Sequence, residues 1–116
     1  MASVLVVEDN DDVREMMAVT LELEGHHVST AVNGRDALDK LHHGERPCVI
    51  LLDLMMPVMN GWELRAALQQ DPALRDIPVV VVSAVTAEIA QRLPDTTYVS
   101  KPVDIDRLLE TVCEYC

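Results

Sequence analysis

The sequence predicts an α/β fold, in which helices cover both faces of a doubly wound, five-stranded parallel sheet. Two observations predict it. Short apolar runs recur along the chain, four of them ending directly in polar residues. The segments between them carry apolar residues at helical spacing and helix-capping residues. Strand and helix alternate five times, as in parallel sheets with right-handed crossovers. The strand order 2-1-3-4-5 suits five strands and places the first strand beside the third.

The first two strands, and the helix after each of them, are predicted from apolar runs and from the glycines that end helices. The apolar run 4–7 predicts the first strand. Asn10-Asp11-Asp12 supplies cap residues for a helix of about 13 residues, which Gly25 ends. The run 27–32 predicts a short strand, and the helix after it ends near Gly44.

The third strand is the most distinctive, because five apolar residues, 48–52, run directly into Asp53. An apolar run of this length predicts a strand that is buried on both faces. Asn60-Gly61 begins the third helix, Asp71-Pro72 ends it, and the valine run 79–82 predicts the fourth strand.

The last part of the chain predicts a short fourth helix, a fifth strand and a final helix. Residues 86–93 can form about two helical turns before Pro94. Residues 97–100 predict the fifth strand, which ends at Lys101, and Asp104 caps the final helix.

Composition sets limits on size and partners. With 116 residues, 49% of them hydrophobic, the chain is expected to form one domain, 1–116, with a core that needs no metal or disulfide. Its 9 basic and 20 acidic residues give a net charge of −11, which repels nucleic acid and anionic membranes. No apolar run approaches the roughly 20 residues of a membrane span. We expect no direct nucleic-acid or membrane partner.

The chain has three cysteines: Cys48, Cys113 and Cys116. Because their number is odd and no signal-like stretch comes before the first strand, a reducing cytosol is the default, and we expect a cytoplasmic protein. Cys113 and Cys116 have the spacing of a redox motif. They lie at the end of the chain rather than at a helix start, where a thiolate would be stabilised, so this spacing does not favour a redox function.

Polar residues at the carboxyl ends of the strands predict one shared site: Glu8-Asp9, Asp53, Ser83 and Lys101. Neighbouring carboxylates disfavour one another's ionisation unless a cation lies among them, and Mg²⁺ suits such oxygen ligands best. A lysine and a hydroxyl suit phosphate. The set indicates a phosphoryl-accepting site, in which Asp53 attacks phosphorus in line while Mg²⁺ and Lys101 neutralise the transferring group.

Taken together and in order, these motifs resemble the receiver domain of two-component response regulators, whose fold is flavodoxin-like. They are Glu8-Asp9, the run from Asp53 to Gly61 with Pro57 and Met59, Ser83-Ala84 and Lys101-Pro102. The resemblance implies a phosphorylation-dependent switch, either a single-domain, chemotaxis-type regulator or a receiver from a longer protein. It implies no enzyme activity beyond the protein's own phosphorylation and dephosphorylation.

The resemblance also implies roles for individual residues. Asp53 would accept a phosphoryl group from a histidine kinase or a histidine phosphotransferase. Mg²⁺ would be bound by Asp9, Asp53 and the Met55 carbonyl, and by Glu8 through water. Lys101 and Ser83 would assist the chemistry, while Ser83 and Tyr98 would act as the conformational switch.

The chain differs from the family pattern in the stretch 84–100, where only 17 residues separate Ser83 from Lys101. Receivers commonly carry a few more, so we expect a shortened fourth helix.

A second function is compatible with the same motifs. The alternative function is a receiver-like interaction domain that binds partners without being phosphorylated. The downstream protein partner is unknown, and the protein is either a monomer or a phosphorylation-dependent dimer.

Overall fold

The computed structural model describes residues 3–54, 56, 58–83, 97–101 and 103–116. Its strands form one parallel sheet of five in the order β2-β1-β3-β4-β5, which is the order that the sequence predicts. The strands are β1 (Ser3–Val7), β2 (His27–Ala31), β3 (Val49–Leu52), β4 (Val79–Ser83) and β5 (Thr97–Ser100). The helices of the described residues are α1 (Asp11–Leu23), α2 (Gly34–His42), α3 (Gly61–Gln70) and α5 (Ile105–Tyr115).

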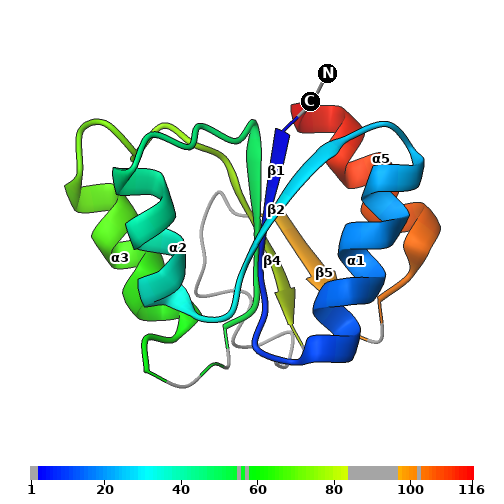
Figure 1. Cartoon of the computed structure of the whole chain (residues 1–116), viewed down its shortest axis with the longest axis horizontal. Coiled ribbons are helices and arrows are strands. Elements are labelled where there is room, and N and C mark those ends of the chain that lie inside the picture. Colours follow the sequence, from blue (N-terminus) through cyan, green and yellow to red (C-terminus); the bar gives the residue numbers. More distant parts are fainter. Residues whose placement is uncertain (1–2, 55, 57, 84–96, 102) are drawn as a thin grey trace.

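The helices cover both faces of the sheet. Figure 1 shows α1 and α5 on one face and α2 and α3 on the other. Successive residues of a strand point to opposite faces, so each strand contributes to two apolar layers. In β3, Val49 and Leu51 pack in one cluster with α1 and α5, while Ile50 and Leu52 pack in the other with α2 and α3. This is why the central strands β1, β3 and β4 are nearly continuous apolar runs.

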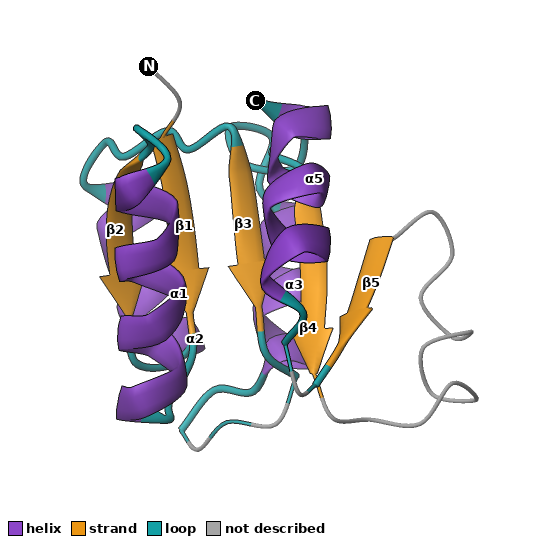
Figure 2. Ribbon diagram, turned by 90° about the vertical axis from the view of Figure 1, so that its right-hand side faces the viewer, coloured by secondary structure: helices purple, strands orange, loops and turns teal. Residues whose placement is uncertain are grey.

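The register of the central strands decides where the polar residues emerge. β1 pairs with β3 from Val4↔Val49 to Val7↔Leu52, so Glu8 and Asp53 follow paired positions. The Asp53 amide donates to the Val7 carbonyl at 3.0 Å, which extends the pairing to the site itself. Figure 2 shows that all five strands point the same way, so their carboxyl ends meet at one edge of the sheet.

Each described helix begins at a capping side chain, as the sequence predicts for three of the four. The Asn60 side chain accepts from the Glu63 amide and the Glu63 side chain accepts from the Asn60 amide, which forms a capping box. α1 has the 13 residues expected of it. The capping residues are Asn10, Asn33, Asn60 and Asp104. The predicted fourth helix, 86–93, lies outside the described residues.

The cysteines correct one expectation. Cys48 and Cys116 form a disulfide with a Cα–Cα distance of 5.7 Å, and Cys113 is free and exposed. The sequence gives redox-motif spacing only to Cys113 and Cys116, and the odd number of cysteines makes reduced thiols the default expectation. The pairing arises because β3 begins and α5 ends at the same edge of the sheet, opposite the carboxyl ends of the strands (Figure 2).

None of the helices in the described part of the chain is long and apolar enough to cross a membrane.

We predict that Val58→Gly stabilises the protein. Val58, in the loop between β3 and α3, has φ of +67° and is 76% exposed. A β-branched residue in this left-handed region is strained by about 1–3 kcal/mol, which exceeds the entropic cost of glycine in the unfolded chain. We expect a net gain of about 1 kcal/mol in the free energy of unfolding, measured by urea denaturation.

The matched control is Val32→Gly, because Val32 is also an exposed valine in a connection but is not among the described residues with positive φ. It should lose about 1 kcal/mol. Equal losses in both variants would show that the Val58 backbone is not strained.

Candidate carboxylate and lysine site

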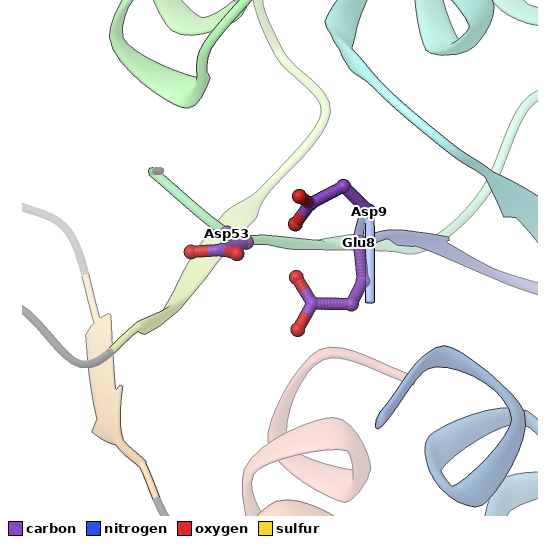
Figure 3. Close-up of side chains that lie close together, drawn as sticks. All are labelled: Glu8, Asp9 and Asp53. Carbon is purple, nitrogen blue, oxygen red and sulfur yellow. The ribbon is translucent and has the colours of Figure 1, made fainter. Parts of the chain in front are cut away.

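Three carboxylates meet where β1 and β3 end. Glu8 and Asp9 follow β1, Asp53 follows β3, and an oxygen of each lies within 4.8 Å of the others. Figure 3 shows Glu8 and Asp9 extending from the same strand end toward the side on which Asp53 lies. Glu8 and Asp53 are buried, at 1% and 6% exposure, whereas Asp9 is exposed. The cluster is therefore shielded from solvent at Glu8 and Asp53 and accessible to solvent at Asp9.

Lys101 reaches this cluster from the far edge of the sheet. It follows β5, which lies two strands away from β3. Its ammonium donates to Glu8 Oε1 and, at 3.3 Å, to Asp53 Oδ2. Residues separated by 93 and 48 positions in the sequence are thus joined by one cation. The structure brings together four of the residues that the sequence assigns to one site.

The charges shift the protonation of the buried groups. Burial and the nearby Asp53 carboxyl raise the pKa of Glu8 to about 7, against the opposing effect of the Lys101 ammonium. Burial acts to lower the pKa of Lys101, but the Glu8 and Asp53 carboxylates outweigh it and the pKa is raised above its ordinary value. Lys101 therefore stays a cation at neutral pH, while Glu8 is poised between its two forms.

The donor set fits a hard divalent cation. All three side chains offer oxygen, and Asp9 is open to solvent on the side where a cation would keep its waters. Within the described residues, the buried Oε2 of Glu8 has no hydrogen-bond partner, which is costly unless an ion or its water occupies that position. One ammonium also balances only one of the three carboxylate charges when all are ionised.

Gly61 allows the first turn of α3 to approach the site closely. A Cβ at this position would lie 2.5 Å from the Asp53 carbonyl oxygen and 2.7 Å from Leu54 Cα. The Gly61 amide donates to the Leu54 carbonyl at 3.1 Å. The helix is therefore seated directly against the backbone that carries Asp53, which explains a glycine in this part of the motif.

Arg14 is a site residue that sequence reasoning missed. Its Nη1 donates to the Glu8 carbonyl at 2.9 Å and to the Asp9 carbonyl at 3.4 Å, while its Nη2 pairs with Asp11. From the first helix, it holds the backbone of both acidic residues. The spacing of Asp11 and Arg14 indicates a helical ion pair, but nothing in the sequence indicates the contacts with the two carbonyls.

Three further site predictions remain untested by the geometry. Ser83 ends β4 and its backbone is paired with Ser100, so it lies at the correct edge of the sheet. Its side chain, the side chain of Tyr98 and the whole of Met55 lie outside what the structure describes. The proposed switch pair and the carbonyl ligand therefore stay predictions.

Comparisons with known proteins agree with this geometry. The profile of the response regulator receiver domain matches residues 4–113. The chain is 34% identical to Protein PilH of Pseudomonas aeruginosa, over 97% of this chain and 95% of PilH. It is 34% identical to the polar-differentiation response regulator DivK of Brucella anthropi, over 97% of this chain and 94% of DivK. The structure of chemotaxis protein CheY4 of Vibrio cholerae matches with a TM-score of 0.89 at 32% identity, over 100% of this chain and 99% of CheY4.

We predict that Glu8 makes the protein less stable as the pH rises, when no divalent cation is present. The pKa of Glu8 is raised from 4.5 to about 7 in the folded protein. Between these pH values Glu8 ionises in the unfolded chain but stays protonated in the folded protein. The free energy of unfolding therefore falls as the pH rises, until Glu8 ionises in the folded protein as well. Between pH 5 and pH 8, the loss attributable to Glu8 is about 2 to 3 kcal/mol. Urea denaturation with a chelator present measures it.

Glu8→Gln should remove this part of the pH dependence, whereas Glu15→Gln, which changes an exposed glutamate on α1, should keep it. The same pH dependence in wild type and Glu8→Gln would contradict the assignment.

Proposed function

Because the chain belongs to the receiver-domain family of two-component response regulators, which are phosphorylation-dependent signalling switches, we propose that Asp53 is its phosphoacceptor. The observation that carries this proposal is the Lys101 ammonium, which joins the buried Asp53 to Glu8 beside Asp9. The proposal is supported because the Asp53 carboxylate, the Lys101 ammonium and further carboxylate oxygens lie within one small space. The proposed receiver domain comprises the whole chain, 1–116.

The chemistry follows from the positions of these groups. An Asp53 oxygen attacks phosphorus, and the bond from phosphorus to the donor's histidine nitrogen breaks, so that the electron pair leaves with the imidazole. Lys101, already beside Asp53 Oδ2, neutralises charge on the oxygens of the transferring group. When bound, Mg²⁺ would supply a second positive charge to the same oxygens. Asp9 and Asp53 would bind it directly, with the Met55 carbonyl, and Glu8 would bind through water.

The response to phosphorylation is the next part of the proposal. A phosphoryl group adds about 1.5 to 2 negative charges and three acceptor oxygens, if ordinary phospho-residues are a guide. Lys101 then exchanges part of its contact with carboxylates for contact with phosphoryl oxygens. We assign Ser83, the last residue of β4, and Tyr98, within β5, to the switch that follows.

The proposed partners are those of a receiver. Receiver domains interact with histidine kinases or phosphotransferases and with downstream targets. We propose a sensor histidine kinase or a histidine phosphotransferase as donor, and a downstream protein as target. We further propose that the protein acts in the cytoplasm, as a monomer or as a dimer that phosphorylation induces. Receivers are signalling domains, and any catalysis by this chain is limited to its own phosphorylation and dephosphorylation.

We predict that acetyl phosphate with Mg²⁺ adds one phosphoryl group to the protein, seen as an increase in intact mass. Asp53→Asn should add none, because it lacks the nucleophile. Asp12→Asn is the matched control, because Asp12 is an exposed aspartate in the first turn of α1, and it should be phosphorylated like wild type. Lys101→Met should react much more slowly, since the transferring group loses its fixed cation.

Unchanged mass in wild type, or phosphorylation that persists in Asp53→Asn, would contradict the assignment of Asp53. Either result would favour the alternative, an interaction domain that works without phosphorylation.

We predict that Mg²⁺ stabilises the fold by relieving repulsion in the carboxylate cluster. At ten times its dissociation constant the gain is about 1.4 kcal/mol, or roughly 4 to 8 °C in melting temperature. Thermal melts at constant ionic strength measure this gain. Fluorescence of Trp62, the chain's single tryptophan, gives a second measurement because Trp62 packs against Leu54, the neighbour of Asp53.

Asp9→Asn should lose most of the gain, and Asp12→Asn should retain it. A melting temperature that responds to NaCl as strongly as to Mg²⁺ in wild type would argue against a specific cation site.

A further inference from the structure

The disulfide joins the residue before β3 to the residue after α5, and a backbone hydrogen bond also holds each of these two residues. The Cys48 amide donates to the Ser3 carbonyl at 2.7 Å, immediately before β3 pairs with β1. The Cys116 amide donates to the Val112 carbonyl at 2.9 Å, so Cys116 continues the last turn of α5. Val112 is buried in the same apolar cluster as Val49 and Leu51. Packing of α5 on the sheet therefore brings the two cysteines together.

The two cysteines also differ in exposure in a way that suits an ordered reaction. Cys116, at the end of the last helix, is exposed, whereas Cys48 is half-buried against the apolar cluster. The Cys48 sulfur lies 3.0 Å from the Ser3 carbonyl oxygen, so a reduced Cys48 thiol has an acceptor in place. The Cys48 thiol released by reduction can donate to a backbone oxygen that already lies beside it, which favours a reversible disulfide.

We propose that Cys48 and Cys116 form a reversible redox site whose substrate is a small-molecule disulfide such as oxidised glutathione. The Cys116 thiolate attacks one glutathione sulfur, the bond between the two glutathione sulfurs breaks, and one glutathione leaves as thiolate. The Cys48 thiolate then attacks the Cys116 sulfur and expels the second glutathione. Two protein thiols are oxidised and one glutathione disulfide is reduced to two thiols, so atoms and electrons balance.

Under the cytoplasmic location proposed above, a reversible role fits this disulfide better than a permanent structural one. Disulfides in the cytosol of ordinary organisms are usually transient, either catalytic or redox-sensing. The bond also has a clear physical effect, because it links positions 68 residues apart and restricts the unfolded chain strongly. In the folded protein it fixes the end of α5 to the start of β3. Oxidation therefore restrains the helix that follows Lys101.

The experiment compares wild type, Cys48→Ser, Cys116→Ser and Cys113→Ser after equilibration with reduced or oxidised glutathione, without a phosphate donor. Free thiols are alkylated under denaturing conditions and counted by intact mass, and peptide mapping locates the linkage. Cys113→Ser is the matched control, because Cys113 is an exposed cysteine on the same helix that takes no part in the bond.

We expect wild type to have three free thiols when reduced and one, Cys113, when oxidised. The melting temperature of the oxidised form should be higher by about 8 to 16 °C. Cys113→Ser should show the same shift, and the other two variants should show none. Subsequent addition of a reducing agent should restore all three thiols in a folded protein.

The proposal is overturned if oxidised wild type keeps three thiols, if the linkage involves Cys113, or if oxidised and reduced wild type melt at the same temperature. Because wild type alone gives these readouts, the test remains valid if a serine variant fails to fold. It is also independent of whether Asp53 is phosphorylated.

Discussion

The functional edge of this protein depends on one ammonium group placed among three carboxylates. Burial makes each charge of Glu8 and Asp53 costly, and each carboxylate disfavours ionisation of its neighbours. Lys101 offsets part of this cost through its contacts with both buried groups. It leaves surplus negative charge on the side where Asp9 is exposed. A site with this surplus gains from binding a cation, and a cation bound there provides the second charge that a transferring phosphoryl group needs.

The sheet holds these groups together against their repulsion. Moving Asp53 away from Glu8 would require β3 to separate from β1. This separation is costly because β3 is fully buried and its pairing continues to the Asp53 amide. Each aliphatic side chain that would be exposed represents about 1.5–3 kcal/mol. The apolar strands therefore outweigh the electrostatic cost at their ends. Gly61 adds a second restraint, because it lets α3 rest on the backbone of Asp53 and Leu54.

Most of this arrangement follows from local sequence signals, and the remainder depends on tertiary contacts. Apolar runs and capping residues predict the strands and helices, and their alternation predicts the strand order, which brings Lys101 to the carboxylates. The contacts of Arg14 depend on which way a long side chain turns from α1, and spacing does not encode that direction. The bond from Cys48 to Cys116 depends on where α5 ends relative to the sheet. Likewise, the positive φ of Val58 opposes the ordinary preference of valine, so the residue type does not predict it.

The last segment of the chain connects both chemical features of the molecule. The charge of Lys101 holds this segment at the carboxyl edge of the sheet, and the covalent bond of Cys116 holds it at the opposite edge. Between these two points, the buried Leu108 and Val112 pack α5 against the sheet. Under the proposals made above, phosphorylation of Asp53 acts on the first of these restraints and thiol oxidation acts on the second. A helix fixed at its far end can respond to a change at Lys101 only by adjusting near its first turn, whereas a helix released there can shift along its whole length. A partner that binds α5 would therefore be affected by both the phosphoryl group and the redox state.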